Sequence, residues 1–246
     1  MTGAEISVQL YSIRDAIAED LSGAVRRIAD LGYTNVEPWG FVDKVEAFGQ
    51  ALTQNSLSAP SAHAGLVAAT DVRPVFEAAR VLGVQTLIDP MVPAERWTSR
   101  AEVQATADRL AGIATEAADH GLTIGYHNHW WELAQQIEGR PALEVFADLL
   151  DERIVLEVDT YWAAVGGVDA PDLLRRLGER VKFLHVKDGP VTEDPKAQLP
   201  AGEGAMDIPA VLAAAPTALR VVEFDAYAGD VFDGLAASLA YLEGQS

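Results

Sequence analysis

Four short stretches of the sequence carry pairs of ionisable side chains two positions apart. The pairs are His127 with His129, Glu157 with Asp159, His185 with Lys187, and Glu223 with Asp225. Side chains two positions apart lie on the same face of an extended strand, so both members of a pair can face one site. Converging carboxylates and imidazoles are costly to bury unless they neutralise one another or bind a cation. A divalent metal site is the simplest interpretation.

The residue pattern favours Asp159, His185 and Glu223 together as metal ligands. Mixed Asp, Glu and His ligands suit Mn²⁺, Co²⁺, Mg²⁺ or Zn²⁺. The chain has no cysteine, which excludes thiolate metal sites, disulfides and cysteine nucleophiles. His63 stands alone in its segment, and we expect it to make a structural or substrate contact.

These residues stand at the ends of segments rich in β-branched residues. Such segments alternate with Ala- and Leu-rich amphipathic segments, with one strand and one helix in roughly every 30 residues. Strands are predicted at 5–11, 34–39, 57–63, 84–90, 122–128, 154–160, 181–187 and 219–225. Helices are predicted at 17–31, 41–54, 71–82, 99–120, 141–150, 171–179, 207–215 and 230–243.

The alternation predicts an α/β fold, a (β/α)8 TIM barrel that forms a single domain over residues 1–246. A doubly wound open sheet is the alternative. That fold normally has a Gly-rich phosphate turn after its first strand, and "QLYSIRD" (9–15) contains no glycine. In a TIM barrel the active site lies at the C-terminal ends of the strands and in the loops that follow.

The predicted strand ends also supply candidates for substrate binding, which are Glu37, Trp39, His63, Glu132 and Trp162. All five tryptophans fall in or beside loops after predicted strands: Trp39, Trp97, Trp130, Trp131 and Trp162. Aromatic faces near a barrel mouth can stack on a sugar ring and exclude water. The alternative is that they pack over the barrel or at a subunit interface. We expect at least one of them to contact substrate.

Charge and composition narrow the range of partners. The chain has 18 basic and 37 acidic residues and a net charge of −19, which disfavours nucleic-acid and membrane partners. Its first residues lack the pattern of a secretory signal, and no apolar run approaches the roughly 18 residues of a membrane span, so a cytoplasmic location is expected. A homodimer is a further expectation for a barrel of this kind.

Five segments together resemble the sugar phosphate isomerase/epimerase family of xylose-isomerase-like TIM barrels. They are "YHNHWWE" (126–132), "LEVDTYWAAVGGVD" (156–169), "LHVKDG" (184–189), "PAGEGAMD" (200–207) and "VVEFD" (221–225). Relatives in this superfamily include ketose 3-epimerases, inosose isomerases and dehydratases, and enzymes that act on 3-keto-glycosides. The resemblance implies one divalent ion, with Mn²⁺ first among Mn²⁺, Co²⁺, Mg²⁺ and Zn²⁺, bound by Asp159, His185 and Glu223.

Two positions depart from the pattern of the ketose epimerases. Those enzymes carry a glutamate where this chain has His127, and often a histidine where it has Trp162. Either His127 completes the metal site, or Glu132 or water assists the other three ligands. A histidine ligand makes the site less negative by one unit of charge and softens its preference for hard cations.

The resemblance implies proton abstraction next to a carbonyl, with metal stabilisation of the enediolate. Candidates for the catalytic residues are Glu223, His129, Lys187 and Glu157. Reprotonation would make the protein an isomerase or epimerase of a keto-sugar, which is the first expectation. Expulsion of a β-oxygen would make it a lyase acting on a 3-keto-glycoside or inosose. A non-catalytic sugar-binding module is the third reading, and the net charge of −19 disfavours a DNA endonuclease.

Overall fold

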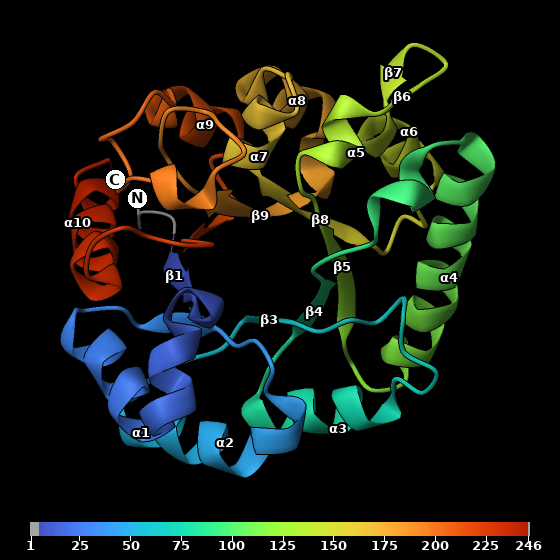
Figure 1. The fold of residues 1–246 in the computed structure, drawn as a ribbon. Helices are drawn as coiled ribbons and strands as arrows, with labels where there is room; N and C mark the ends of the chain where they lie inside the picture. The colour runs from blue at the N-terminus through green and yellow to red at the C-terminus, as the bar shows by residue number, and fades with distance from the viewer. Residues whose placement is uncertain (1–4, 246) are drawn as a thin grey trace.

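Eight parallel strands form a nearly closed barrel in this computed structural model, which describes residues 5–245 (Figure 1). Their order around the sheet is β2-β1-β10-β9-β8-β5-β4-β3. The strands are β1 Ile6–Gln9, β2 Asn35–Glu37, β3 Ser61–His63, β4 Thr86–Asp89, β5 Thr123–His127, β8 Val155–Asp159, β9 Val181–Val186 and β10 Leu219–Val222. The predicted TIM barrel is confirmed.

The main helices surround the sheet (Figure 1). They are α1 Arg14–Asp30, α2 Val45–Gln54, α3 Arg73–Leu82, α4 Arg100–Ala118, α6 Ala142–Leu149, α8 Ala170–Leu177, α9 Ile208–Ala214 and α10 Val231–Glu243. The sequence predicted each of these helices and all of the barrel strands, with ends displaced by a few residues. Within residues 5–245, no helix combines the length and apolar character that a membrane crossing requires.

Shorter elements that the sequence did not predict lie in the loops after β5 and β8. They are α5 Trp131–Ala134, the hairpin of β6 Gln136–Ile137 with β7 Arg140–Pro141, and α7 Thr160–Val165. The side chain of Asp159 caps α7 by accepting a hydrogen bond from the backbone N–H of Trp162. Asp159, the last residue of β8, is therefore also the N-cap of α7.

The helices pack on the barrel through apolar faces. In α3, Phe76 and Ala79 are fully buried, and Pro74 occupies the first turn. Gly83 ends the helix in a left-handed conformation (φ 73°) that a residue with a Cβ rarely adopts. The chain then returns to the sheet, where Leu87 is fully buried. Helix, turn and strand thus repeat the local pattern from which the barrel was predicted.

The ladder between β8 and β9 contains a register shift. Leu156 pairs with Val181, but its neighbour Glu157 pairs with Phe183. The shift also sets Asp159 opposite His185, and paired residues of parallel strands point to the same side of the sheet. A bulge of this kind re-aims side chains beside functional sites.

The barrel is joined least extensively between β2 and β3. Two isolated bridges connect this part of the described chain, Asn35 with Ser58 and Trp39 with His63. The second bridge includes a hydrogen bond of 2.9 Å from the N–H of His63 to the carbonyl of Pro38. We call this junction the β2–β3 seam.

Candidate active site

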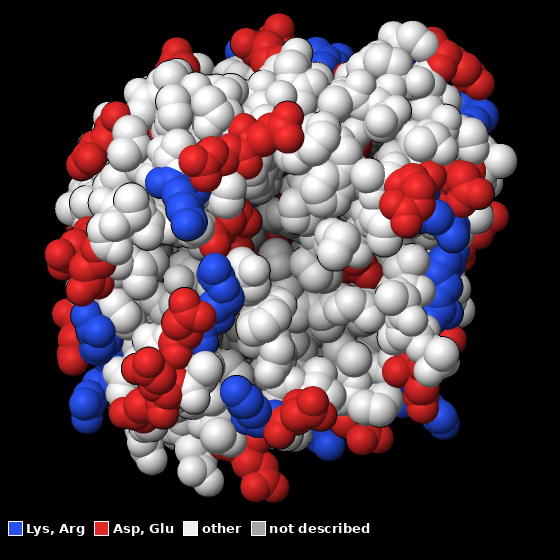
Figure 2. Space-filling model, viewed as in Figure 1, with Lys and Arg blue, Asp and Glu red and all other residues white. Residues whose placement is uncertain are grey.

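A hollow of about 310 Å³ opens at the C-terminal ends of the barrel strands. Its lining residues are Tyr11, Trp39, His63, Pro90, Met91, His127, His129, Glu223 and Asp225. Acidic side chains are visible inside the central recess of this face (Figure 2). We call this cavity the first hollow.

Three buried histidines surround the carboxylate of Glu157. Its Oε2 atom lies 2.6 Å from Nε2 of His63, 2.9 Å from Nδ1 of His127 and 3.1 Å from Nε2 of His185. The Oε1 atom of Glu37 lies 3.1 Å from His63 and 3.0 Å from His185. The two carboxylates therefore hold the imidazole rings in fixed positions.

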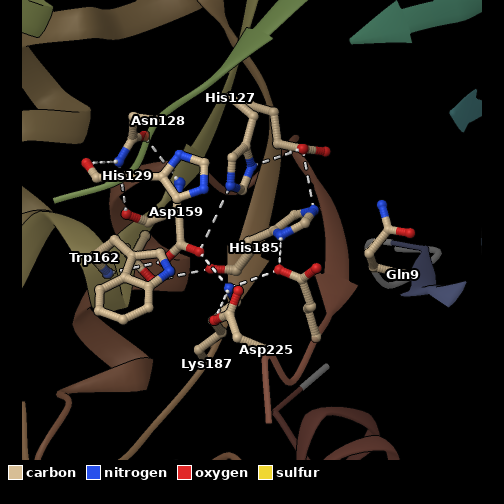
Figure 3. A network of polar contacts seen from close by, with 12 residues as sticks. Gln9, His127, Asn128, His129, Asp159, Trp162, His185, Lys187 and Asp225 are labelled. Atoms are coloured by element: carbon tan, nitrogen blue, oxygen red, sulfur yellow. Dashed lines mark hydrogen bonds and ion pairs between the residues drawn. The ribbon is translucent and has the colours of Figure 1, made fainter. Parts of the chain in front are cut away.

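A buried ammonium group lies among three other carboxylates. Nζ of Lys187 is 2.8 Å from Asp159 Oδ2, 2.6 Å from Glu223 Oε2 and 2.6 Å from Asp225 Oδ2 (Figure 3). Gln198 also donates to Asp225 at 2.7 Å. Burial opposes the charge of Lys187, but Asp159 and Asp225 outweigh it and raise the pKa of the ammonium well above its usual value. The lysine is a fixed positive charge beside the first hollow.

The histidines differ in charge. Burial disfavours protonation of His63, but Glu37 and Glu157 outweigh this effect and raise its pKa to about 10. Against the same penalty, Glu157 and Glu223 raise the pKa of His185 well above its usual value. Two of the three rings around Glu157 are therefore imidazolium ions when no metal is bound.

His127 and His129 are neutral by contrast. Burial and then the charge of His185 lower the pKa of His127 well below its usual value. Burial and then the charge of Lys187 lower the pKa of His129 to about 4. The ring of His129 stacks on Trp131, and its buried Nδ1 has no hydrogen-bond partner among the described residues. His129 thus presents an unprotonated imidazole to the first hollow.

The backbone of Asp159 is held by two hydrogen bonds with the side chain of Asn128. Asn128 accepts the N–H of Asp159 at 3.1 Å and donates to its carbonyl at 3.2 Å (Figure 3). Burial raises the pKa of the Asp159 carboxyl to about 6 despite the opposing charge of Lys187. Its Oδ2 atom forms an ion pair with Lys187 but has no hydrogen-bond partner of suitable geometry within the described chain.

Two sets of buried side chains have the composition and spacing of a metal site. One is His127, Asp159, His185 and Glu223, and the other is His63, His127, Glu157 and His185. Within each set the possible ligand atoms all lie within 4.8 Å of one another. Buried oxygens of Asp159 and Glu157 lack hydrogen-bond partners in the described residues, and nitrogen with oxygen donors suits a borderline divalent ion. The residues therefore fit a divalent cation.

The four residues predicted as ligands from the sequence make up the first of these sets. The catalytic candidates are spread over the cluster. Glu223 and His129 line the first hollow, and Lys187 lies next to Glu223. Glu157 does not line the hollow and contacts three histidines, whose rings it positions.

Three of the residues expected to bind substrate do not line the first hollow. Glu132 is fully buried and accepts hydrogen bonds from the Tyr126 hydroxyl at 2.7 Å and the His129 N–H at 2.9 Å. Glu37 is occupied by the histidines and by a hydrogen bond from Gln9 at 2.7 Å. Both carboxylates are held by protein donors, so their contact with substrate stays a prediction.

Trp162 is the third residue. Its ring is 6% exposed and lies 5.7 Å from Nζ of Lys187. It therefore packs against the charged cluster and does not line the first hollow (Figure 3). The two remaining substrate candidates, Trp39 and His63, both line it.

Several supporting residues were missed by the reading of the sequence. Asn128 lies between the two histidines of "YHNH", one residue beyond the end of β5, where strand alternation no longer predicts direction. Ser61 donates to Glu37 from β3, and Gln198 reaches Asp225 from a loop. A strand-end polar residue such as Ser61 could have been found by its position, whereas no local signal marks Gln198.

Comparison with known proteins places the chain in a family. The family model for "Xylose isomerase-like TIM barrel" matches residues 25–216. An inosose dehydratase of Clostridium perfringens is 32% identical over 95 residues, which are 38% of this chain and 29% of that protein.

Two solved structures share the fold over nearly their whole length. A sugar phosphate isomerase/epimerase from Parabacteroides distasonis superposes with a TM-score of 0.78 at 21% identity, covering 98% of this chain and 94% of that one. The 3-keto-D-glucoside 4-epimerase of E. coli gives 0.72 at 16% identity, covering 98% and 99%. With the match of the family model and the buried His, Asp and Glu cluster, they lead to one conclusion: this chain belongs to the xylose isomerase-like TIM barrel family.

Proposed function

We propose that the protein is a divalent-metal-dependent isomerase or epimerase that moves a proton at the carbon next to the carbonyl of a keto-sugar. The observation that carries this proposal is the set of four possible ligands, His127, Asp159, His185 and Glu223, at the side of a sugar-sized hollow. The names of the two structural neighbours, an isomerase/epimerase and a keto-glucoside epimerase, support the same reaction class.

The four residues would hold one ion, with Mn²⁺ first among Mn²⁺, Co²⁺, Mg²⁺ and Zn²⁺. Such an ion, when bound, draws electron density from the carbonyl oxygen and makes the neighbouring C–H bond more acidic. Nitrogen ligands from His127 and His185 with oxygen ligands from Asp159 and Glu223 suit these ions.

Proton acceptors flank the first hollow on two strands that are separated by β8 and β9 in the sheet. His129 follows β5, is neutral and lines the hollow. Glu223 follows β10 and is ionised, because the positive charges of Lys187 and His185 outweigh burial and lower its pKa. Acceptors at two places around one carbon skeleton allow a proton to leave from one position and return at another.

Lys187 favours a second candidate function. Its buried ammonium is held 2.6 Å from Glu223, so a fixed positive charge lies next to a possible base. A fixed positive charge of this kind can stabilise the negative charge that develops on a departing oxygen, as a β-elimination requires. A lyase acting on a 3-keto-glycoside or inosose uses the same residues, and the inosose dehydratase similarity supports this alternative.

The first experiment measures metal content by mass spectrometry for the wild type, Asp159→Ala, His185→Ala and the surface control Asp108→Ala. We expect about one equivalent of a divalent ion in the wild type and the control, and little in the two site variants. The same four proteins are then incubated with 3-keto-glucose in D₂O, and the products are followed by NMR.

Deuterium at the carbon next to the carbonyl, falling roughly 10³-fold in both site variants, supports proton transfer as the reaction. An isomer or epimer as product identifies the first function, and a dehydrated product identifies the lyase. A wild type that takes up no divalent ion would show that the ligand set is wrong. Ion binding without any deuterium exchange would favour the sugar-binding module.

A further inference from the structure

A second hollow of about 250 Å³ adjoins the first. It is lined by Trp39, Gly40, Phe41, Val42, Asp43, His63, Ala64, Gly65, Val75 and Pro90. Trp39, His63 and Pro90 line both hollows, so the two form one continuous groove. The groove runs from the ionisable cluster towards α2 and α3.

Backbone hydrogen bonds hold the walls of the second hollow in place. The carboxylate of Asp89 accepts the N–H groups of Leu66 and Val67 at 2.7 Å each, and that of Met91 at 3.0 Å. It therefore ties the loop that contains Gly65 to the turn that contains Pro90. Asp89 was a strand-end candidate in the sequence, and the structure gives it this scaffold role.

Trp39 stands where the two hollows meet. Its side chain is 43% exposed, although the bridge to His63 fixes its backbone. Its ring lies edge-on to Tyr11, with 5.0 Å between the ring centres. A large aromatic face that is exposed beside a polar site suits stacking on a sugar or another flat ring.

The chemistry of the second hollow excludes a phosphorylated ligand as its best occupant. Apart from His63 at the junction, its one ionisable lining residue among those described is Asp43, and no lysine or arginine lines it. A phosphate placed there would meet the Asp43 carboxylate, and the charge of His63 is already paired with Glu37 and Glu157. The other lining residues are mostly apolar, which suits a neutral and partly apolar group.

We propose that the second hollow is a subsite for the aglycone or second ring of a neutral glycoside. A keto-glycoside is then the preferred substrate over a free or phosphorylated keto-sugar. This inference rests on the proposed function and names its substrate class. The volume agrees: 310 Å³ alone is at the lower limit of ordinary ligand sites, and the adjoining 250 Å³ extends the groove beyond one ring.

The test compares methyl and phenyl 3-keto-β-D-glucopyranoside, which differ only in the aglycone. Calorimetry gives the Kd of each, and deuterium exchange gives kcat/KM. In the wild type we expect about tenfold preference for the phenyl compound, the scale of one aromatic contact. Trp39→Ala and Gly65→Phe should abolish the preference, whereas Met91→Ala, which alters the first hollow alone, should keep it.

Gly65→Phe is suitable as a blocking variant. A Cβ at Gly65 meets nothing within 4 Å, and the backbone there is not left-handed. The added side chain therefore begins in open space at the wall of the second hollow. Thermal melting of Trp39→Ala and Gly65→Phe checks that both variants remain folded.

The outcomes separate this inference from the proposed function. Exchange with both compounds but no phenyl preference overturns the subsite and leaves the function standing. Tighter binding of the phenyl compound that depends on Trp39, without exchange, supports the subsite and overturns the function. Tighter binding of 3-keto-glucose 6-phosphate than of the phenyl compound, or no binding of either glycoside, also overturns the subsite.

Discussion

The two halves of the barrel contribute different things to the site. Strands β1 to β4 supply few ionisable groups to the cluster, chiefly Glu37 and His63, but they supply the walls of the second hollow. Strands β5, β8, β9 and β10 and the residues directly after them supply the rest: His127, His129, Glu157, Asp159, His185, Lys187, Glu223 and Asp225. The half formed by β5, β8, β9 and β10, called the reactive half, therefore supplies most of the ionisable groups. The half formed by β1 to β4 supplies the walls of the second hollow.

This division shows that the ionisable cluster and the walls of the groove can be supplied by different strands. The reactive half has the longer strands, with up to six residues in β9, and a register shift that aligns Asp159 with His185. The other half has strands of three residues at β2 and β3 and leaves room between its loops. Substitutions in one half should therefore leave the property of the other half intact.

The largest expected effect is a loss of deuterium exchange in Lys187→Met, in the reactive half. Deuterium exchange should fall roughly 10²- to 10³-fold, the range for loss of a fixed charge that stabilises developing negative charge. Divalent-ion affinity should rise, because the ammonium no longer competes for Asp159 and Glu223. The phenyl preference should stay unchanged. Lys182→Met, on the exposed side of the same strand, is the control.

Loss of the phenyl preference in Lys187→Met would contradict the division between the halves. Loss of bound metal in that variant would show that Lys187 supports the ion. Both readouts come from titrations of the same purified protein, namely calorimetry with each glycoside and with the metal.

A smaller effect, on the free energy of unfolding and on the phenyl preference, is expected from Asp89→Ala in the half formed by β1 to β4. Three backbone N–H groups lose their acceptor, which should lower the free energy of unfolding by about 3 kcal/mol. The phenyl preference should fall with it, while the metal content stays near one equivalent. Urea denaturation measures the first change. Asp89→Asn keeps the size and part of the accepting capacity, so its loss should be intermediate.

The smallest effect concerns Glu132, which lies in the reactive half but does not face the first hollow. Burial raises its pKa to about 8, whereas an unfolded glutamate titrates near pH 4.3. Between these values the folded chain keeps a proton that the unfolded chain has lost. The free energy of unfolding therefore falls as the pH rises through this window.

Glu132→Gln removes this titration. Between pH 5.5 and 8.5 the wild type should lose roughly 3 kcal/mol more stability than the variant, measured by urea denaturation. Parallel losses in both proteins would show that Glu132 is ionised at the lower pH as well. The metal content should be equal in the two proteins, because Tyr126 and His129 hold this carboxylate away from the ligands.

Most of the fold and much of the site could be predicted from the sequence. Periodicity located the strands and helices, because each element buries one face. The rule that strand ends form the site located His127, Asp159, His185 and Glu223, which the structure brings within reach of one ion. Those residues lie inside strands or next to them, where side-chain direction follows from alternation.

The surroundings of a side chain could not be predicted where the chain leaves regular structure. Glu132 lies in α5, and its direction depends on the hydroxyl of Tyr126, which no local pattern reveals. Trp97 also follows a strand but is fully buried against Tyr126 and Phe146. The choice between core and pocket for these side chains is made by tertiary contacts between loops, which the spacing of residues does not encode.

The β2–β3 seam has a consequence for how this protein can change over evolution. Two isolated bridges join these strands, so few backbone hydrogen bonds constrain the length of the segments that flank them. Trp39 and His63 place this seam along the groove, whereas Asp159 and Glu223 project from other strands. Insertions near the seam can therefore change the shape of the second hollow with few backbone hydrogen bonds lost, while the ionisable cluster on the other strands stays in place.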